Sequence, residues 1–213
     1  MSRLVAFFED KPVDLKGRLE LQQEPLVTAL DRVSSTGALR SSLVYVERLG
    51  ETGPFLVPFG EYDEWSLRDR YNEAIRIMNT LGASEIACET WGQVASQRRI
   101  SIRFRGKGPQ VTQQRIQNGG YDFKHHGAGS SPRDPRPLRW PDEPGFAAAV
   151  SSVLDNGATQ VTINIRSTRT HAVDGELGVQ LKKVGFDLGG GNAREEATSL
   201  FIQASFPTTR KWR

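Results

Sequence analysis

The sequence predicts an α+β fold, with a mixed, mostly antiparallel sheet and about four helices packed on it. Three observations carry this prediction. Residues 63–81 have an apolar stripe at helical spacing. Several short segments alternate between apolar and polar residues, which is typical of half-buried strands. Two such segments flank Gly50-Glu51-Thr52-Gly53, a hairpin signal. A length of 213 residues fits one long domain or two small ones.

The N-terminal elements are expected to be short. Residues 4–8 are predicted as a strand, and residues 43–47 and 55–59 as the two strands of the hairpin. Because proline has no backbone N–H, Pro54 and Pro58 place the second of these strands at an edge of the sheet. A helix is expected after Pro25, with one face made by Leu26, Leu30 and Val33.

The clearest helix is predicted over residues 63–81, and Gly82 is well placed to follow its last turn. Its apolar stripe consists of Leu67, Tyr71, Ala74, Met78 and Leu81. Strands are expected at 86–91 and at 99–105. Side chains alternate along a strand, so the second of these has an apolar face and a face of arginines that includes Arg99, Arg103 and Arg105.

The C-terminal third is predicted to hold helices near 146–154 and 173–184 and strands at 161–165 and 200–206. A possible internal repeat of helix, Gly-Ala and strand occurs at a separation of 75 residues, around Gly82-Ala83 and Gly157-Ala158. The expected organisation is therefore an N-terminal α+β unit at 1–105 and a Gly/Pro-rich basic loop or linker at 106–142. A C-terminal α+β unit at 143–213 is expected to share one core with the first.

Composition narrows the class of protein. The single cysteine, Cys88, excludes an intramolecular disulfide and a multi-cysteine metal site. No apolar stretch is long enough to span a membrane, and the N-terminal apolar run is too short for a secretory signal. We therefore expect a protein of the cytoplasm.

Charge is the strongest functional signal. The formal net charge of +3 hides an uneven distribution. Residues 94–140 hold ten cations and two anions, a charge of +8, so the other 166 residues together carry −5. A concentrated basic stretch is the footprint of a phosphate-rich partner. Arginine dominates it, which favours bidentate contacts with phosphate.

These observations predict a non-catalytic binding module or assembly subunit. Its basic strand face and loop would contact an anionic partner, preferably nucleic acid, and aromatic residues interleaved with the cations would stack on bases. The interleaved aromatics are Phe104, Tyr121, Phe123 and Trp140. A separate set outside the clearest core stripes, Trp65, Trp91, Phe201 and Trp212, could instead serve a membrane surface or a protein interface. The predicted anion-binding residues are Arg98, Arg99, Arg103, Arg105, Lys107, Arg115, Lys124, Arg133, Arg136 and Arg139.

Two alternatives stay open. The first is a metal-dependent phosphoester hydrolase that uses Asp122, His125, His126 or His171, although neighbouring histidines in an extended segment point in opposite directions. The second is a protein-interaction subunit whose basic face docks on an acidic protein. We expect no cofactor and no metal, because the sequence lacks a dinucleotide fingerprint, a nucleophile elbow and a paired-histidine zinc motif.

Overall fold

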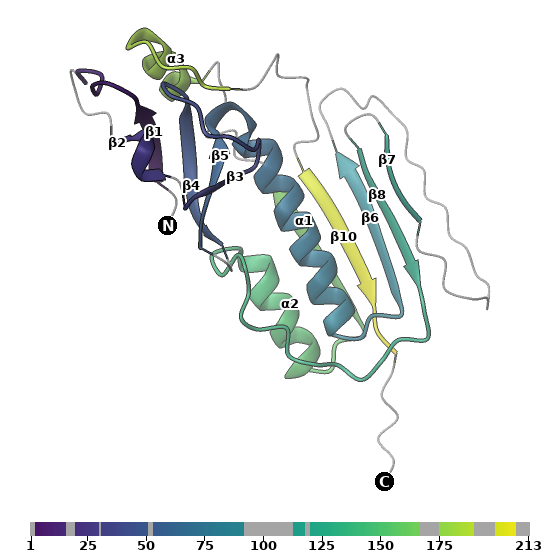
Figure 1. Cartoon of the computed structure of the whole chain (residues 1–213). Helices are drawn as coiled ribbons and strands as arrows, with labels where there is room; N and C mark the ends of the chain where they lie inside the picture. Colours follow the sequence, from purple (N-terminus) through teal and green to yellow (C-terminus); the bar gives the residue numbers. More distant parts are fainter. Residues whose placement is uncertain are drawn as a thin grey trace. The chain divides into compact units, whose positions relative to one another are not determined.

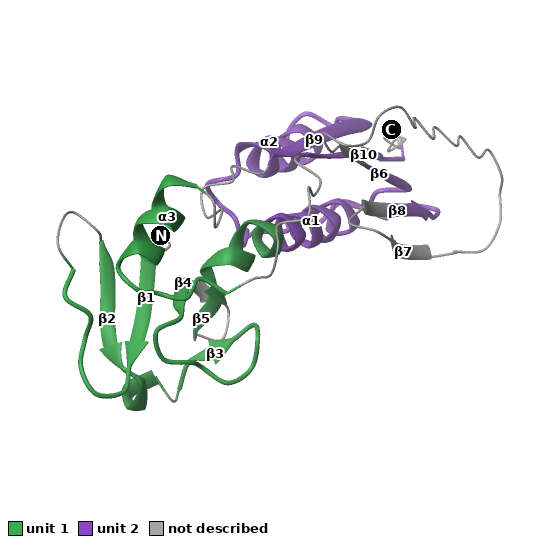
Figure 2. Ribbon diagram, turned by 90° about the horizontal axis from the view of Figure 1, so that it is seen from above, with its two compact units in different colours: residues 1–66, 168–194 green, residues 67–167, 195–213 purple. Residues whose placement is uncertain are grey.

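The chain divides into two compact units in a computed structural model (Figure 2). Unit 1 comprises residues 1–66 and 168–194, and unit 2 comprises residues 67–167 and 195–213. The structure describes residues 3–15, 20–29, 31–50, 53–91, 113–117, 120–166, 175–189 and 199–207.

Unit 1 is built on a mixed five-stranded sheet in the order β2-β1-β4-β5-β3. Its strands are β1 (Arg3–Phe8), β2 (Leu21–Pro25), β3 (Val33–Ser34), β4 (Val44–Gly50) and β5 (Gly53–Pro58). The predicted hairpin is confirmed, because β4 and β5 are antiparallel and Gly50 pairs with Gly53. The pairs β1–β2 and β3–β5 are parallel.

The sheet of unit 1 is buried on both faces. On one face, Val44 and Val46 pack with Leu181 and Phe186 of the segment around α3 (Glu176–Lys183). On the other face, residues such as Tyr45 join a second apolar cluster. Successive residues of β4 therefore belong to different clusters, which explains why Val44, Tyr45 and Val46 are all fully buried.

Two predictions for unit 1 are corrected. β5 is not an edge strand, since β3 lies outside it; β3 pairs only with Phe55 and Leu56, so neither Pro54 nor Pro58 lies opposite it. The helix expected after Pro25 is a single 3-10 turn, Leu26–Ala29. Val33 instead enters β3, where a β-branched residue is favoured. The described residues thus contain three α-helices and two sheets, where about four helices and one sheet were expected.

Unit 2 is built on a five-stranded sheet in the order β7-β8-β6-β10-β9, in which every neighbouring pair is antiparallel. Its strands are β6 (Glu85–Trp91), β7 (Gln113–Gln117), β8 (Gly120–His126), β9 (Gln160–Arg166) and β10 (Ser199–Ser205). Two helices, α1 (Tyr62–Thr80) and α2 (Pro144–Leu154), share one core with the inward side chains of the sheet. Figure 1 shows α1 lying along β10 and β6.

Helix α1 confirms the predicted apolar stripe, whose members are all buried. It ends in a Schellman motif, in which the amide of Gly82 donates to the carbonyl of Asn79 and that of Ala83 to Met78, both at 3.0 Å. Gly82 has a φ of +81°, a conformation that residues with a side chain rarely adopt. The end of α1 is thus fixed by local chemistry that the sequence already indicated.

The helix–glycine–strand arrangement recurs as the sequence suggested. Helix α2 is followed by Gly157, with a φ of +64°, and then by β9. Strands β6 and β9 both pair with β10, so the strands of the two copies lie in one sheet and run in the same direction. The core of unit 2 contains residues that precede the basic stretch in the sequence and residues that follow it, for example Ile86 and Ile163.

The boundaries at 105/106 and 142/143, which were predicted to separate the basic loop from the units before and after it, remain a prediction, because residues 92–112 lie outside the described part of the chain. The predicted strand at 99–105 falls in the same gap. None of the described helices combines the length and the apolar character that a bilayer crossing requires.

Candidate nucleic-acid interface

The predicted anion-binding residues fall into three groups. Arg98, Arg99, Arg103, Arg105 and Lys107 lie outside the described residues. Arg115 lies in β7, where only the backbone is described, opposite Asp122 of β8. The side chains of Lys124, Arg133, Arg136 and Arg139 are described, and they do not lie on one surface.

Strand β8 corrects the expectation that residues 106–142 hold no regular structure. It pairs with β6 and β7, inside the sheet. The sequence did carry a signal for this hairpin: Gln117 pairs with Gly120, and Asn118-Gly119 stands between them in the sequence. Asn-Gly is the strongest short-range hairpin signal. The predicted "loop" histidines are therefore strand residues.

The two histidines of β8 point to opposite faces of the sheet. His125 pairs with buried Ile86 and stacks on Phe123, with ring centroids 6.5 Å apart. His126 pairs with Glu85, and its Nδ1 lies 3.9 Å from the Glu85 carboxylate. The two imidazoles cannot bind one metal ion, as the extended-segment argument predicted. The Asp122 side chain and His171, the other residues of the hydrolase alternative, lie outside the described residues.

Three predicted cations lie on a strap, defined here as residues 127–143, which connects β8 to α2 along α1. Arg133 is exposed, and its amide donates to the carbonyl of Thr80 in α1 at 3.0 Å. Arg136 forms a close ion pair with Asp134 of the strap itself, 2.6 Å between Nη2 and Oδ2. This pair holds the pKa of Asp134 below its ordinary value, through the hydrogen bonds from Arg136.

The strap is anchored on α1 by the buried carboxylate of Glu73. Arg76 donates two hydrogen bonds to it, at 2.6 and 2.7 Å, and the backbone amide of Arg139 donates a third at 3.0 Å. Arg76 also donates to the carbonyl of Pro135 at 3.0 Å. Burial by itself raises the pKa of Glu73, but the hydrogen bonds from Arg76 and Arg139 outweigh it, and the pKa lies below its ordinary value.

A second anchor surrounds Trp140. Its indole Nε1 donates to Asp69 at 2.7 Å, and the Arg70 guanidinium lies 5.4 Å from its ring centroid. Arg70 also donates to Glu143 at 3.3 Å and to the carbonyl of Arg166 at 3.1 Å. Trp140, interleaved with the cations in the sequence, therefore packs as a structural residue of the strap.

Lys124 lies on the other side of the sheet from both helices. It pairs with Ala87, whereas inward-facing Phe123 pairs with Cys88. We define the open face as the outward described side chains of β6, β8, β9 and β10, all exposed or half-buried. They are Glu85, Ala87, Glu89, Lys124, His126, Gln160, Thr162, Asn164, Arg166, Ser199, Phe201, Gln203 and Ser205.

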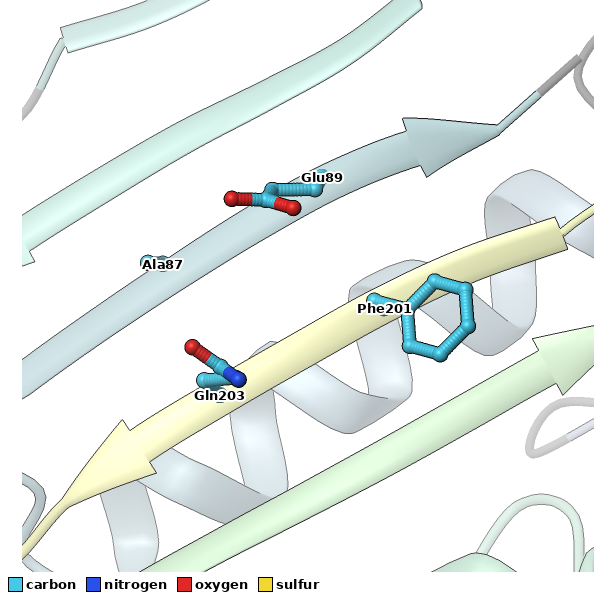
Figure 3. A pocket seen from close by; sticks show the side chains of 4 residues that line it. All are labelled: Ala87, Glu89, Phe201 and Gln203. Carbon is cyan, nitrogen blue, oxygen red and sulfur yellow. The ribbon is translucent and has the colours of Figure 1, made fainter. Parts of the chain in front are cut away.

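A shallow depression of about 160 Å³ lies on the open face. It is lined by Ala87 and Glu89 of β6 and by Phe201 and Gln203 of β10 (Figure 3). Glu89 pairs with Phe201 across the two strands, and Ala87 pairs with Gln203. Sequence alternation shows only that such residues point outward. Their grouping depends on the strand register, so the sequence did not reveal Glu89 and Gln203 as site residues.

The described part of the open face is electrostatically balanced. Its two acids, Glu85 and Glu89, are matched by Lys124 and Arg166. The positive charge of the basic stretch therefore resides mainly in the residues that follow β6 in the chain, from Arg98 to Arg115, and in the strap. The open face contributes a flat surface with an aromatic ring and hydrogen-bonding groups.

Comparison with known proteins identifies no relative: no family model, no curated protein and no solved structure matches the chain.

Proposed function

We propose that the chain is a non-catalytic binding module for nucleic acid, and that unit 2 carries the interface. One observation supports this most directly: the basic stretch is an insertion into a sheet with an open face. It leaves that sheet at the end of β6 and re-enters it through β7 and β8, whose outward side includes Lys124. An open antiparallel sheet is the kind of surface on which RNA-binding domains place unpaired bases.

In this proposal the basic stretch and the open face have different roles. The arginines of the basic stretch attract phosphates and release condensed counterions, which supplies affinity without sequence preference. The open face, with its balanced charge, contacts bases rather than phosphates. In nucleic-acid interfaces, phosphate contacts commonly position the protein, and base contacts supply the sequence specificity.

The proposal predicts salt-dependent binding that Arg99, Arg103 and Arg105 dominate. Fluorescence anisotropy of labelled duplex and single-stranded oligonucleotides at two salt concentrations measures it. Replacing all three arginines by alanine should make the slope of log K against log salt shallower by about 2 for a single strand, since each phosphate contact contributes about 0.7. Affinity at low salt should fall by at least tenfold.

A matched control removes the same charge elsewhere. Lys11, Arg40 and Lys182 are exposed cations of unit 1, and their triple replacement by alanine should leave the slope unchanged. If the two triple variants lose affinity equally, net charge rather than the basic stretch explains the binding. Absence of any binding at low salt contradicts the proposal, and co-purification of the chain with an acidic protein free of nucleic acid would favour the protein-interaction alternative.

A further inference from the structure

We propose that the chain forms a two-fold dimer in which β9 pairs edge to edge with β9 of a second copy, so that the two sheets of unit 2 join into one. The inference does not depend on the proposed function. It concerns the edge of the sheet at β9, whereas the basic stretch enters the sheet at the opposite edge, through β7.

The edge of β9 exposes a row of backbone groups. Among the described strands, β9 bonds to β10 alone. The amide of Phe206 donates to the carbonyl of Thr159 at 2.9 Å, which fixes the phase of this antiparallel ladder. Because the bonds alternate along each strand, the even-numbered residues of β9 direct their N–H and C=O groups away from β10. The carbonyl of Arg166 agrees with this assignment, since it accepts from Arg70 of α1 at 3.1 Å.

The other even-numbered residues of β9 have unmet hydrogen bonds. The backbone groups of Gln160, Thr162 and Asn164 that face away from β10 have no partner among the described residues. The Asn164 side chain adds a further group, because its Oδ1 is buried and accepts no hydrogen bond from any described residue. A buried polar atom without a partner costs free energy, so a neighbour that donates to it would stabilise the chain.

The edge of β9 also lacks the features that keep other sheet edges apart. In unit 1, the edge strand β2 is shorter, carries Glu24 and ends at Pro25, and the edge strand β3 has only two residues. Charge, proline and short length all oppose edge-to-edge pairing. Strand β9 spans seven residues, and its one charged residue is Arg166 at the end. Its valine, threonine and two isoleucines are β-branched, which favours a further strand partner.

The register of the dimer follows from the length of β9. An antiparallel pairing centred on Ile163 is the one that pairs all seven residues of the strand with the second copy. Thr162 then lies opposite Asn164 of the second copy, and the two residues exchange both backbone hydrogen bonds. The Thr162 hydroxyl lies beside the Asn164 amide and can donate to it. At each end Gln160 lies opposite Arg166, so no like charges meet.

Helix α2 allows the close approach that this pairing requires. It packs on β9 (Figure 2), and a Cβ on Gly145 would lie 3.1 Å from Ile163. The two-fold axis places α2 and its copy on the same face of the joined sheet, where neighbouring helix axes lie about 8–10 Å apart. Larger or charged side chains would oppose that distance, and α1 exposes Glu64 and Arg68. The exposed residues of α2 are compact and uncharged: Pro144, Ala147, Ala148 and Ser151.

A second copy is the partner that these features fit. A two-fold contact brings the same surface together twice, so a charged surface would repel its own copy. The surface formed by β9 and α2 contains a single charged residue, Arg166, which the register places opposite Gln160. Pairing uses the β9 edge of both copies, and the assembly therefore closes at two.

Sedimentation equilibrium without nucleic acid, over an about hundredfold range of protein concentration, tests the dimer. We expect a reversible equilibrium between monomer and dimer, with no larger species. Thr162→Pro removes an N–H that faces away from β10, so each sheet keeps its own bonds while the edge is blocked, and the variant should stay monomeric. The control Thr162→Ser keeps the N–H and the hydroxyl, and should change the dissociation constant by less than about threefold.

Charge exchange at the ends of β9 tests the register and does not require a proline variant to fold. Gln160→Lys places like charges opposite each other at both ends and should weaken association about tenfold. Adding Arg166→Glu to that variant turns both contacts into attractions and should restore association. Amide exchange measured by NMR gives a third readout. Thr162 and Asn164 should exchange more slowly as the protein concentration rises, whereas Ile163, which bonds within the chain, should not change.

Three outcomes would overturn the inference. They are a chain that stays monomeric at every concentration, a dimer that survives Thr162→Pro, and a dissociation constant that Gln160→Lys leaves unchanged. Since these measurements contain no nucleic acid, none of their outcomes bears on the proposed function, which the oligonucleotide titrations test separately.

Discussion

Replacing Gly82 by alanine is expected to destabilise unit 2 by about 3–4 kcal/mol, against about 1 kcal/mol for the same replacement at Gly157. Both glycines follow a helix and have positive φ, +81° and +64°. A Cβ at Gly157 meets nothing within 4 Å, so it adds only the conformational cost. A Cβ at Gly82 would overlap the carbonyl oxygen of Ser130 and lie 2.9 Å from its carbonyl carbon.

The difference arises because the strap passes directly over the end of α1. The amide of Ser130 donates to the carbonyl of Gly82 at 3.2 Å, which fixes the two backbones against each other. A methyl group between them forces the strap to move. Hydrogen exchange measured in increasing urea would give the stability of each unit separately. Peptides from β9 and β10 report the unfolding of unit 2, and peptides from β1 and β4 report that of unit 1 as an internal control. Equal losses at Gly82 and Gly157 would contradict this packing.

Glu73→Ala is expected to cost unit 2 about 3 kcal/mol, at the lower end for a broken buried ion pair. The substitution removes the carboxylate that accepts hydrogen bonds from the amide of Arg139 and from Arg76, whose side chain is 35% exposed and can regain part of its hydration. Glu73→Gln keeps the shape and one acceptor, so its cost should be about 1–2 kcal/mol. Asp134→Asn breaks an ion pair of the same strap at the surface and should not change the midpoint of unfolding measurably.

The role of Glu73 also has a pH signature. Its pKa is lowered in the folded chain, so its contribution is present above the unfolded pKa and is lost as the pH falls through the folded pKa. In the unmodified chain, the urea midpoint should therefore fall once the pH drops below the ordinary pKa range of a glutamate. The Glu73→Gln variant should show a smaller fall, because glutamine does not titrate. Parallel pH curves for the two proteins would show that the Glu73 carboxylate is not coupled to folding.

Much of the secondary structure follows from local patterns. The stripe through Leu67 and Met78 predicted α1, and the alternation at residues 200–206 predicted β10. In each case the apolar residues recur at the spacing that places them on one buried face of the element. Leu26–Ala29 form a 3-10 turn instead of the predicted helix, since three apolar residues at helical spacing do not outweigh β-branched neighbours and a strand partner. β8 was not predicted, although Asn118-Gly119 is a hairpin signal, because few apolar residues alternate along this polar strand.

The candidate site was less accessible to sequence reasoning. Charge counting located the basic stretch, and alternation showed that Phe201 points away from the core. The sequence did not show how the cations are distributed in space: Arg139 contacts the buried Glu73 of α1, while Lys124 lies on the open face. A linear count of charge cannot distinguish a cation that neutralises a buried acid from one that faces a ligand.

By itself the sequence determined the α+β class, the ends of the main helices, the hairpin at residues 50–53 and the concentration of positive charge. Each of these depends on interactions between residues a few positions apart, such as helical spacing, turn chemistry and strand alternation. Only the tertiary structure decided the two sheets, the interior position of β8, the strap over Gly82 and the grouping of Glu89 with Phe201 and Gln203. Those features depend on which strand pairs with which and in what register, and pairing energies between segments a hundred residues apart leave no periodic trace in the chain.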